Sequence, residues 1–474
     1  MRRIFTFLAG QSCRSALKSW AAQPRRPTED VKVLALHPRN PEVLTASLFL
    51  CKARFFATTA WQQPSTRKSN ILKTTKRSQI GGAMALFCLL CALANPAPLF
   101  ALGIRLPDQD AFATARGNAF VATASDPSAV YYNPAGITQL DGANLSLGMY
   151  GITLASRYTS ATGSSINSQQ QWAALPEAFA TMSCTNCHLT LGLGLYCPYG
   201  LAMAWPKNAP WVAAGLPRSG EIDYYRANPV VAWHPCDTLS IAAGAMLDYS
   251  QAELQLSPPF PPGAQTRLRG RDEDAGFNLG LLWHPWEQHS FGMTYRSATD
   301  MDFNGHATTM VGGATVAEQG TKLNYHLPQT VVLGYSYRPS KYWNLEADAD
   351  WTDWTSLRTL SVTGTPLKYA FNWKPSMIYE FGATRYFGKG WRASAGYMYS
   401  ENSVPSSSFN ALVPDSDRHL FSVGVGKAWQ HLTCDAAYQL GFGPSRSIPA
   451  SDAPYNGSYE FFSNALSINI GWHF

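Results

Sequence analysis

Residues 117–142 read GNAFVATASDPSAVYYNPAGITQLDG. The stretch has almost no charge and no helical or strand period of useful length. Proline at positions 127 and 134 disfavours the helical conformation at Asp126 and Asn133, so both pairs indicate turns. Apolar side chains are nevertheless frequent, namely Phe120, Val121, Val130, Tyr131, Tyr132, Ile137 and Leu140. An irregular segment with so much apolar surface needs a surrounding shell, because its free backbone groups must find partners.

Composition favours β structure for the rest of the chain. Of the 474 residues, 13% are aromatic and only 14% are charged, and Gly, Ser and Thr are plentiful. Residues 1–83 contain 15 Lys or Arg and 3 Asp or Glu, which leaves 22 basic and 28 acidic residues for the remainder, a net charge of −6. This mildly acidic body offers no basic surface for nucleic acid.

A secretory signal peptide is predicted at residues 72–101. Lys73, Lys76 and Arg77 precede the apolar run AMALFCLLCALA, and small residues permit cleavage after Ala94 or Ala101. The alternative, a transmembrane anchor, is disfavoured because about 17 apolar residues are needed to cross a bilayer. Residues 1–71 precede this export signal. We expect translation to start at residue 72, read from a UUG codon; the alternative is a transit-type extension.

From residue 144 onwards, apolar and polar residues alternate, which is typical of β-strands. Fourteen strands are predicted, centred near residues 149, 180, 194, 228, 245, 279, 295, 332, 348, 382, 396, 424, 436 and 470. Short connections alternate with long ones, which include loops at 255–272 and 301–321. Trp residues gather at strand ends, as in an aromatic girdle, namely Trp233, Trp283, Trp343, Trp351, Trp354, Trp391 and Trp472.

This pattern predicts an all-β fold, a 14-stranded antiparallel transmembrane β-barrel of the bacterial cell outer membrane. The alternative, a soluble β-sandwich, needs no asymmetry of connections. An even number of strands puts both ends of the barrel, residues 143–474, on the periplasmic side. A lumen of this width is not filled by wall side chains alone. Residues 102–142 are therefore predicted to plug it as a hatch.

The same alternation predicts which side chains face lipid and which face water. Leu193 and Ile470 are expected to meet lipid, and Asn469 and Asp348 to meet water. Glu346, Asp348 and Asp350 form one lumenal row. We interpret this row as the wet face of a barrel strand; the alternatives are general acids or a cation path.

The sequence Cys184-Thr-Asn-Cys187-His188 matches the C-x-x-C-H pattern of haem c attachment. It lies in a short predicted turn with no haem-sized apolar pocket in the local sequence. A disulfide between Cys184 and Cys187 is the preferred interpretation, because the periplasm is oxidising. No metal-ligand cluster and no nucleophile–base pair emerges, so no cofactor, metal or enzymatic activity is expected.

Several motifs, taken together and in order, resemble the outer-membrane long-chain fatty-acid and hydrophobic-compound transporter family (FadL/TodX). The resemblance covers residues 102–474. The motifs are Gly117-Asn-Ala-Phe120, Asp126-Pro127, Asn133-Pro134-Ala135, Gly192-Leu-Gly-Leu-Tyr-Cys-Pro-Tyr-Gly200, Thr294-Tyr-Arg-Ser297, Trp351-Thr-Asp-Trp354, Asn372-Trp373, Val404-Pro405 and Pro414-Asp-Ser-Asp-Arg418. The resemblance implies a plugged barrel that passes hydrophobic molecules by passive diffusion and opens sideways into the membrane.

The resemblance also implies site residues. Gly117, Asn118, Phe120, Asn133, Pro134 and Ala135 would form the hatch and gate. Lys374 matches a basic position that would hold a substrate carboxylate, whereas Gln251 stands where a basic residue is expected in fatty-acid-specific members.

A lateral exit is expected at Cys197, Pro198, Tyr199 and Gly200, because proline cannot donate to a strand ladder and marks a bend or an unpaired edge. The alternative is that Pro198 already lies above the membrane, in a loop that begins near Leu201.

The preferred function is outer-membrane transport of long-chain fatty acids or other hydrophobic molecules, with the loops collecting substrate. The expected partners are hydrophobic small molecules such as long-chain fatty acids or hydrocarbons, outer-membrane lipids and the barrel-assembly machinery. A structural or adhesive barrel is the alternative, although such a barrel needs no plug. A lipase-type enzyme is a further alternative, for which no Ser–His pair can be assigned.

Overall fold

The computed structural model describes residues 104–169, 171–184, 187–258, 261–357, 359–361 and 368–474. The chain divides into two units, residues 1–86 and 87–474, and every described residue belongs to the second. The predicted signal peptide and the segment before it lie outside the described residues. No helix in the described part of the chain is long and apolar enough to cross a membrane.

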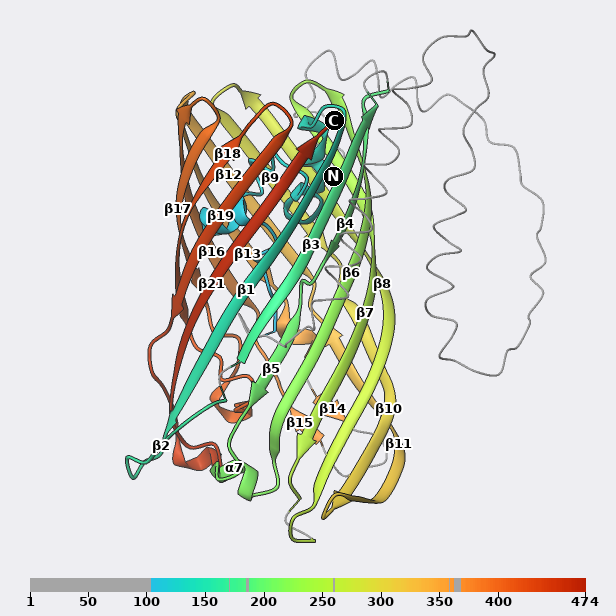
Figure 1. Cartoon of the computed structure of the whole chain (residues 1–474), viewed down its shortest axis with the longest axis vertical. Coiled ribbons are helices and arrows are strands. Elements are labelled where there is room, and N and C mark those ends of the chain that lie inside the picture. Colours follow the sequence, from blue (N-terminus) through green and yellow to red (C-terminus); the bar gives the residue numbers. More distant parts are fainter. Residues whose placement is uncertain (1–103, 170, 185–186, 259–260, 358, 362–367) are drawn as a thin grey trace, which may run out of the picture. The chain divides into compact units, whose positions relative to one another are not determined.

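Within the described residues, fourteen antiparallel strands close into a barrel, because β1 pairs with β21 along its whole length (Figure 1). Three of the fourteen are interrupted and carry two labels each, β4 with β5, β9 with β10 and β11 with β12. The strands are β1 (Ala143–Thr159), β3 (Gln171–Cys184), β4 (Leu189–Tyr196), β6 (Pro217–Cys236), β7 (Leu239–Leu256), β8 (Gln265–Trp286), β9 (His289–Arg296), β10 (Thr299–Val311), β11 (Ala314–Leu327), β12 (Thr330–Ser340), β13 (Trp343–Thr352), β16 (Ser376–Gly388), β17 (Trp391–Ser400), β18 (Arg418–Ala428), β19 (Leu432–Phe442) and β21 (Gly457–His473).

The remaining elements are short, and all of them except β5, which continues β4 along β6, lie in the connections. They are the strands β2 (Ser165–Asn167), β5 (Gly200–Ala204), β14 (Thr359–Ser361), β15 (Lys368–Ala370) and β20 (Arg446–Ile448), the helix α7 (Pro210–Ala213), and the 3-10 turns η2 (Trp354–Ser356), η3 (Ser406–Ser408) and η4 (Ala450–Asp452). Short turns and the C-terminus lie at the upper end of the barrel in Figure 1, and the long connections lie at the lower end. We assign the upper end to the periplasm, because short turns lie there in bacterial outer-membrane barrels.

The predicted barrel is confirmed, and each predicted centre falls within a strand. The structure contradicts the prediction of two loops, at residues 255–272 and 301–321. Most of residues 301–321 belongs to β10 and β11, and residues 265–272 belong to β8. These strands continue beyond the length needed to cross a membrane, so their pattern becomes polar on the outside while the backbone pairing persists.

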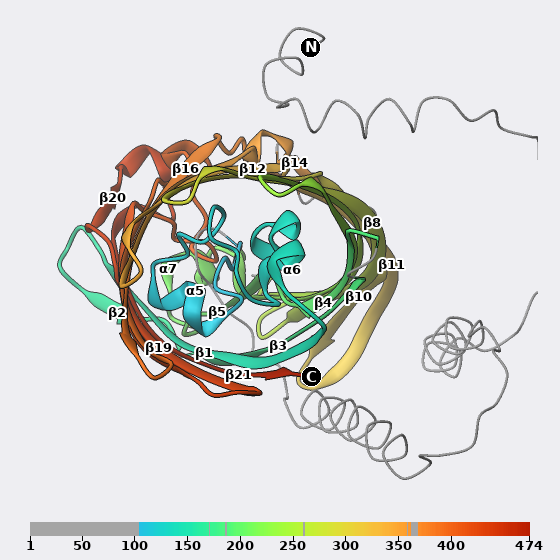
Figure 2. The ribbon, with the colours of Figure 1, turned by 90° about the horizontal axis from the view of Figure 1, so that it is seen from above.

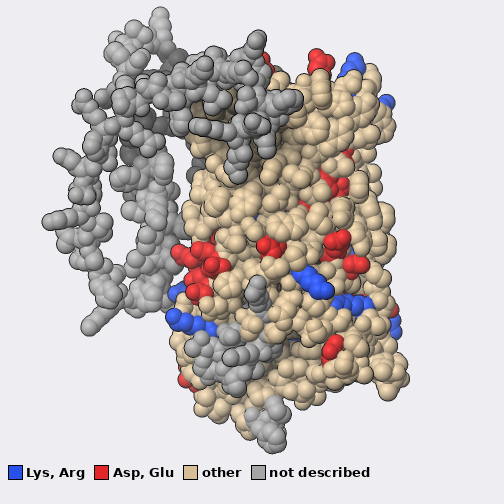
Figure 3. Space-filling view, turned by 180° about the vertical axis from the view of Figure 1, so that it is seen from behind, with Lys and Arg blue, Asp and Glu red and all other residues tan. Residues whose placement is uncertain are grey.

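Apolar side chains face outward along most strands and form a hydrophobic belt. Leu193 and Ile470 are 43% and 51% exposed, as expected for lipid contact. Figure 3 shows charged side chains at the upper rim of the back face and again from above its middle downward, with a narrower uncharged band between the two groups. Trp343, Trp391 and Trp472 stand exposed near the upper ends of their strands, but Trp354 is buried and does not belong to an aromatic girdle.

Residues 104–142, here called the hatch, lie inside the ring of strands (Figure 2). The hatch contains α5 (Ala111–Ala115), α6 (Ala129–Tyr132) and the 3-10 turn η1 (Pro134–Gln139). These elements are too short to give a sequence period. Asp110 caps α5, since its carboxylate accepts the N–H groups of Phe112 and Ala113 at 2.8 and 3.1 Å.

Two apolar clusters fill the lumen at different heights. The hatch cluster is built from hatch residues and inward side chains of β3, β4, β6, β7 and β8. The outer cluster combines inward side chains of the wall with residues from the long connections. It includes Tyr158, Trp205, Trp211, Trp373, Phe409, Leu412 and Tyr459.

The turn between β3 and β4 contains a disulfide between Cys184 and Cys187, with a Cα–Cα distance of 5.6 Å. This disulfide was predicted from the sequence in preference to haem attachment, and the structure contains it. The next residue, His188, lies beside His234 of β6, with 2.9 Å between ring nitrogens. The disulfide therefore closes a hairpin connection at the periplasmic end.

Candidate functional site: hatch, wall opening and pocket

Three carboxylates of β13 hold the hatch against the wall. Asp348 and Glu346 accept hydrogen bonds from the backbone N–H groups of the four consecutive residues 120–123, at distances of 2.7–3.1 Å. Asp348 is only 4% exposed, so the expectation that it meets water is wrong. It does face the lumen, but the hatch covers it. The row is a clamp for a segment whose backbone groups would otherwise lack partners.

Two arginines of the hatch pair with the same row. Arg116 is fully buried and donates to Glu346 at 2.9 Å, and Arg105 donates to Asp350 at 2.6 Å. Hydrogen bonds between charged groups are roughly twice as strong as neutral ones, and burial removes competing water. The row therefore fixes both the position and the orientation of the hatch.

Asn133 joins the end of the hatch to a second part of the wall, strand β8. Its side-chain amide donates to the carbonyl oxygens of Val121 and Leu281, at 2.8 and 3.0 Å. Its own oxygen accepts the N–H group of Ala135 at 3.2 Å and so begins η1. Gly280 of β8 makes this approach possible, because a Cβ there would lie 2.5 Å from the Asn133 side-chain oxygen.

A left-handed turn shapes the middle of the hatch. Gly117 and Asn118 have φ angles of +63° and +61°, which glycine and asparagine tolerate best. Asn118 donates to Asp108 at 2.8 Å and accepts the hydroxyl of Tyr132 at 3.0 Å. Phe120 is completely buried, 5.4 Å from the ring of Tyr132 in an edge-to-face contact. Pro134 and Ala135 are also buried in the hatch.

The wall is interrupted between β3 and the strand that follows it. The pairing of β3 with β4 extends from Cys184 and Leu189 to Ala178 and Leu195, and then stops. The remaining residues of β3 pair only with β1 within the described chain. After a bend at residues 197–199, β5 resumes pairing with β6 at Gly200. The wall therefore has a gap on one side of this bend.

The bend contains the expected exit residues Cys197, Pro198, Tyr199 and Gly200, all of them buried. Leu201 lies in β5 and still pairs with the wall, so no loop begins there. The interpretation that Pro198 already stands in such a loop is wrong. In Figure 2, β5 lies inside the ring of strands.

The start of the hatch satisfies the backbone groups at the bend. Leu106 donates its N–H to the carbonyl oxygen of Pro198, and Gly200 donates to Ile104, both at 2.9 Å. Arg105 forms an isolated bridge with Tyr199 between these two bonds. The segment that covers the bend is thus the segment clamped by Asp350.

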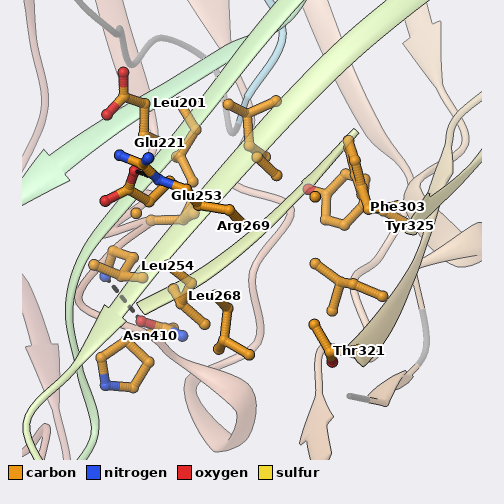
Figure 4. Close-up of a pocket in the computed structure, with 18 of the residues that line it drawn as sticks. Leu201, Glu221, Glu253, Leu254, Leu268, Arg269, Phe303, Thr321, Tyr325 and Asn410 are labelled. Atoms are coloured by element: carbon orange, nitrogen blue, oxygen red, sulfur yellow. Dashed lines mark hydrogen bonds and ion pairs between the residues drawn. The ribbon is translucent and has the colours of Figure 1, made fainter. Parts of the chain in front are cut away.

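An apolar pocket lies in the part of the lumen nearest the long connections. It encloses a space of about 880 Å³, including its open mouth. In Figure 4, apolar side chains line its centre, and Glu221, Glu253 and Arg269 gather on one side. Its apolar lining includes Leu201, Ile222, Ala252, Leu254, Leu268, Phe303, Leu323, Tyr325, Phe371, Leu412 and Val413.

One carboxylate at the pocket is paired with two arginines. The carboxylate of Glu253 pairs with Arg269 at 2.6 Å and with Arg267 at 3.0 Å. Lys374 does not line the pocket; its side chain is exposed, and it lies three residues after the lining residue Phe371. Gln251 is also exposed, on the outer face of β7.

Most of the residues that line the pocket were not predicted from the sequence. Its lining comes from the outer halves of five strands, β6, β7, β8, β10 and β11, which were partly predicted as loops. A signal was present, since inward positions such as Leu323 and Tyr325 alternate with polar residues. The contribution of Phe371 and Leu412 comes from connections and carries no such signal.

The sequence and the fold are both similar to those of known transport proteins. A long-chain fatty acid transport protein of Escherichia coli O6:H1 is 22% identical over 406 residues, covering 74% of this chain and 89% of that protein. The crystal structure of a Pseudomonas aeruginosa FadL homologue superposes with a TM-score of 0.70 at 17% identity, covering 78% of this chain and 99% of the other. The Ralstonia pickettii toluene transporter TbuX superposes with a TM-score of 0.60 at 15% identity, covering 79% of this chain and all of the other.

The sequence profile of one family, described as outer membrane protein transport protein (OMPP1/FadL/TodX), matches residues 94–473. This match spans most of the chain, and the hatch, barrel and resemblance of motifs agree with it. The protein therefore belongs to the OMPP1/FadL/TodX family of transport proteins of the bacterial outer membrane, as its motifs predicted.

Proposed function

We propose that the barrel carries small hydrophobic molecules from the outside, through the apolar pocket, to the gap beside β3, where they enter the membrane. One observation carries this proposal. Leu201 lines the pocket and directly follows Gly200 of the bend, so the pocket and the wall opening adjoin. Transfer of apolar surface out of water supplies the driving force, and no cofactor is required.

The substrate class follows from the lining of the pocket. Its centre is apolar, and Glu253 and Arg269 at its side are already paired with each other. This favours hydrocarbon chains or aromatic hydrocarbons, the classes that the names of the fatty acid and toluene transporters indicate for those relatives. Lys374 is proposed to meet a fatty-acid carboxylate outside the pocket, while the acyl chain enters past Phe371.

The gate is proposed to be the hatch. Its first described residues bond to the bend, and its middle is clamped to β13. Displacement of residues 104–106 would free both the bend and the space behind it. A purely structural or adhesive barrel requires no such segment, which is why transport is preferred.

Membrane lipids and the barrel-assembly machinery are the further partners proposed here. The hydrophobic belt provides the lipid contact. Phe474 ends the chain directly after β21, and its N–H donates to Ala143 at 2.9 Å. We propose that this aromatic end is presented to the assembly machinery when the barrel closes.

A pocket-filling substitution tests the proposal. Ala252 is half-buried and lines the pocket, so Ala252→Trp should fill it, whereas Ala245→Trp on the same strand should project into lipid. Binding of a fluorescent fatty acid and of toluene to the purified protein should fall sharply for Ala252→Trp and stay unchanged for Ala245→Trp. Mass spectrometry of co-purified lipids should show the same difference. Undiminished binding by a folded Ala252→Trp protein would exclude this pocket.

A further inference from the structure

The periplasmic rim of the barrel is divided into two halves of different chemistry. The turns β3–β4, β6–β7 and β8–β9 contain histidines, Asp237 and Glu287, and no Lys or Arg. The next three turns, β12–β13, β16–β17 and β18–β19, have the opposite charge. Residues 337–343, 384–391 and 427–432 contain no Asp or Glu, and their cations are Arg338, Lys341, Arg385, Lys389 and Lys427.

Two pairs of strands in this second half, β13 with β16 and β17 with β18, place a cation opposite a tryptophan. Arg385 of β16 lies directly opposite Trp343 of β13, and Lys427 of β18 lies directly opposite Trp391 of β17. The Arg385 guanidinium is 5.0 Å from the centre of the Trp343 ring, and the Lys427 ammonium is 4.9 Å from that of Trp391. These contacts hold the cations at the outer surface.

More aromatic rings extend the same surface. The Arg385 guanidinium also lies 5.2 Å from the ring of Tyr342 and 6.0 Å from that of Phe387. Phe387 and Trp429 are 63% and 53% exposed, and each lies two residues nearer the periplasmic turn than Arg385 and Lys427, respectively. We call this surface, residues 337–343, 385–391 and 427–429, the basic aromatic arc.

The cations of the arc lack counter-charges. Among the described residues, none of the five forms an ion pair with a carboxylate. Arg392, one residue beyond the arc, differs because it faces inward and pairs with Asp435 at 2.6 Å. The Lys427 ammonium donates only to the backbone carbonyl of Lys389, which joins two turns of the arc. The arc therefore presents unneutralised positive charge at the membrane surface (basic side chains at the upper rim in Figure 3).

We propose that the basic aromatic arc is a binding site for an anionic phospholipid of the periplasmic leaflet. The phosphate would lie between Arg385 and Lys427, and the rings of Trp343 and Trp391, which are level with these cations, would contact the glycerol region. Aromatic rings prefer this interfacial depth, and juxtamembrane cations attract anionic lipid. A soluble anion would gain nothing from the rings, which is why a lipid is the occupant that fits. The proposal does not depend on the transported substrate.

Native mass spectrometry of the full-length protein, released from vesicles of equal parts phosphatidylglycerol and phosphatidylcholine, tests this. The wild type should retain phosphatidylglycerol preferentially. In Arg385→Gln/Lys427→Gln the preference should fall by about fivefold for each charge removed. The matched control Arg271→Gln/Lys322→Gln removes two exposed charges from the other half of the barrel and should retain the preference. The charge-conserving variant Arg385→Lys/Lys427→Arg should largely retain it.

Heat-modified mobility on gels checks that each variant is folded before lipids are counted. Equal retention of both lipids by the wild type would overturn the proposal. So would an unchanged preference in the folded double variant. Retention of an anionic periplasmic protein, without a phosphatidylglycerol preference, would mean that the arc serves a protein partner and would also overturn it.

Discussion

Asn133 shows how single residues of the hatch reach the wall. Its amide group satisfies the buried carbonyl oxygens of Val121 and Leu281. Asn133→Ala leaves both without this donor, at a cost of about 1–3 kcal/mol for a buried group left unpaired. We expect an assembled barrel with altered uptake of hydrophobic molecules and faster hydrogen exchange in residues 129–139.

The control for this variant is Asn304→Ala. Asn304 is exposed on β10, and its amide donates to the carbonyl of Asp302 at 2.8 Å. Because water replaces an exposed donor, the control should behave like the wild type. If Asn133→Ala takes up every hydrophobic compound at the wild-type rate, the hatch is not the gate.

Glu346 accepts more hydrogen bonds from the hatch than its position in the strand pattern indicates. Besides two backbone N–H groups, it accepts Arg116, which is wholly buried. Glu346→Gln leaves that guanidinium uncompensated, and breaking a buried ion pair costs about 3–5 kcal/mol. The hatch should detach while the strands stay paired, which limited proteolysis near residues 116–124 would detect. Wild-type protease resistance would show that the clamp is not needed to hold the hatch.

These residue-scale contacts explain what alternation alone can and cannot predict. Alternation correctly put Asp348 and Asn469 on the lumenal side. It could not show that both are covered by the hatch, with Asn469 accepting the N–H of Ala111 at 2.8 Å. A carboxylate facing water and one facing a backbone segment have the same strand pattern. Only the partner in space distinguishes them.

At the scale of the element, the bend between β4 and β5 can be tested by closing the gap. Ala174 belongs to the part of β3 that has no partner in β4, and Ala202 belongs to β5, in which Ala204 accepts the N–H of Gln169 just before β3 at 2.8 Å. A thiol cross-link between Ala174→Cys and Ala202→Cys should block uptake without unfolding the barrel. The control pair is Ala180→Cys with Leu193→Cys, which are already register partners in β3 and β4. Full uptake with the first cross-link in place would mean that substrate leaves through the periplasmic end.

The hydrophobic belt gives a second element-scale prediction. Leu466 lies near the middle of the apolar part of β21 and is 53% exposed. An arginine at the midplane of the lipid face costs about 2–4 kcal/mol. Leu466→Arg should therefore lower the free energy of unfolding in vesicles by that amount, measured by denaturant titration. The control is Gln251→Arg, at an exposed position on the outer half of β7, which should hardly change the free energy of unfolding. Equal decreases in this free energy for both variants would show that the hydrophobic belt does not include Leu466.

Strands were predictable because lipid imposes a strict period of two on their outer faces. The proline at position 198 also located the bend, since it cannot donate to a ladder. The outer halves of β8, β10 and β11 were harder to predict. Above the membrane, their outward residues, such as Arg269 and Lys322, are as polar as those of a loop.

At the scale of the molecule, apolar clusters fill both halves of the lumen, while the strand pairing of the wall is interrupted beside β3. The hatch cluster fills the periplasmic half, and the outer cluster closes the half nearest the long connections, where Trp205 and Trp211 meet at 5.0 Å. A hydrophobic molecule can follow the pocket to the gap beside β3. A sugar or an ion has no comparable route, because each closure is apolar and densely packed with aromatic rings.

Uptake of hydrophobic molecules should therefore occur without leakage of sugars or ions. Vesicles containing the protein should take up a hydrophobic probe without swelling in sucrose and without a steady ionic conductance across a planar bilayer. Removal of residues 104–142 alone should raise the conductance only slightly, since the outer cluster remains and does not include most of the hatch. Conductance should rise fully only when Trp205→Ala and Trp211→Ala are combined with that deletion. An intact protein that leaks sucrose as fast as it takes up the hydrophobic probe would show that substrate crosses along the barrel axis, and the wall opening would then have no role in transport.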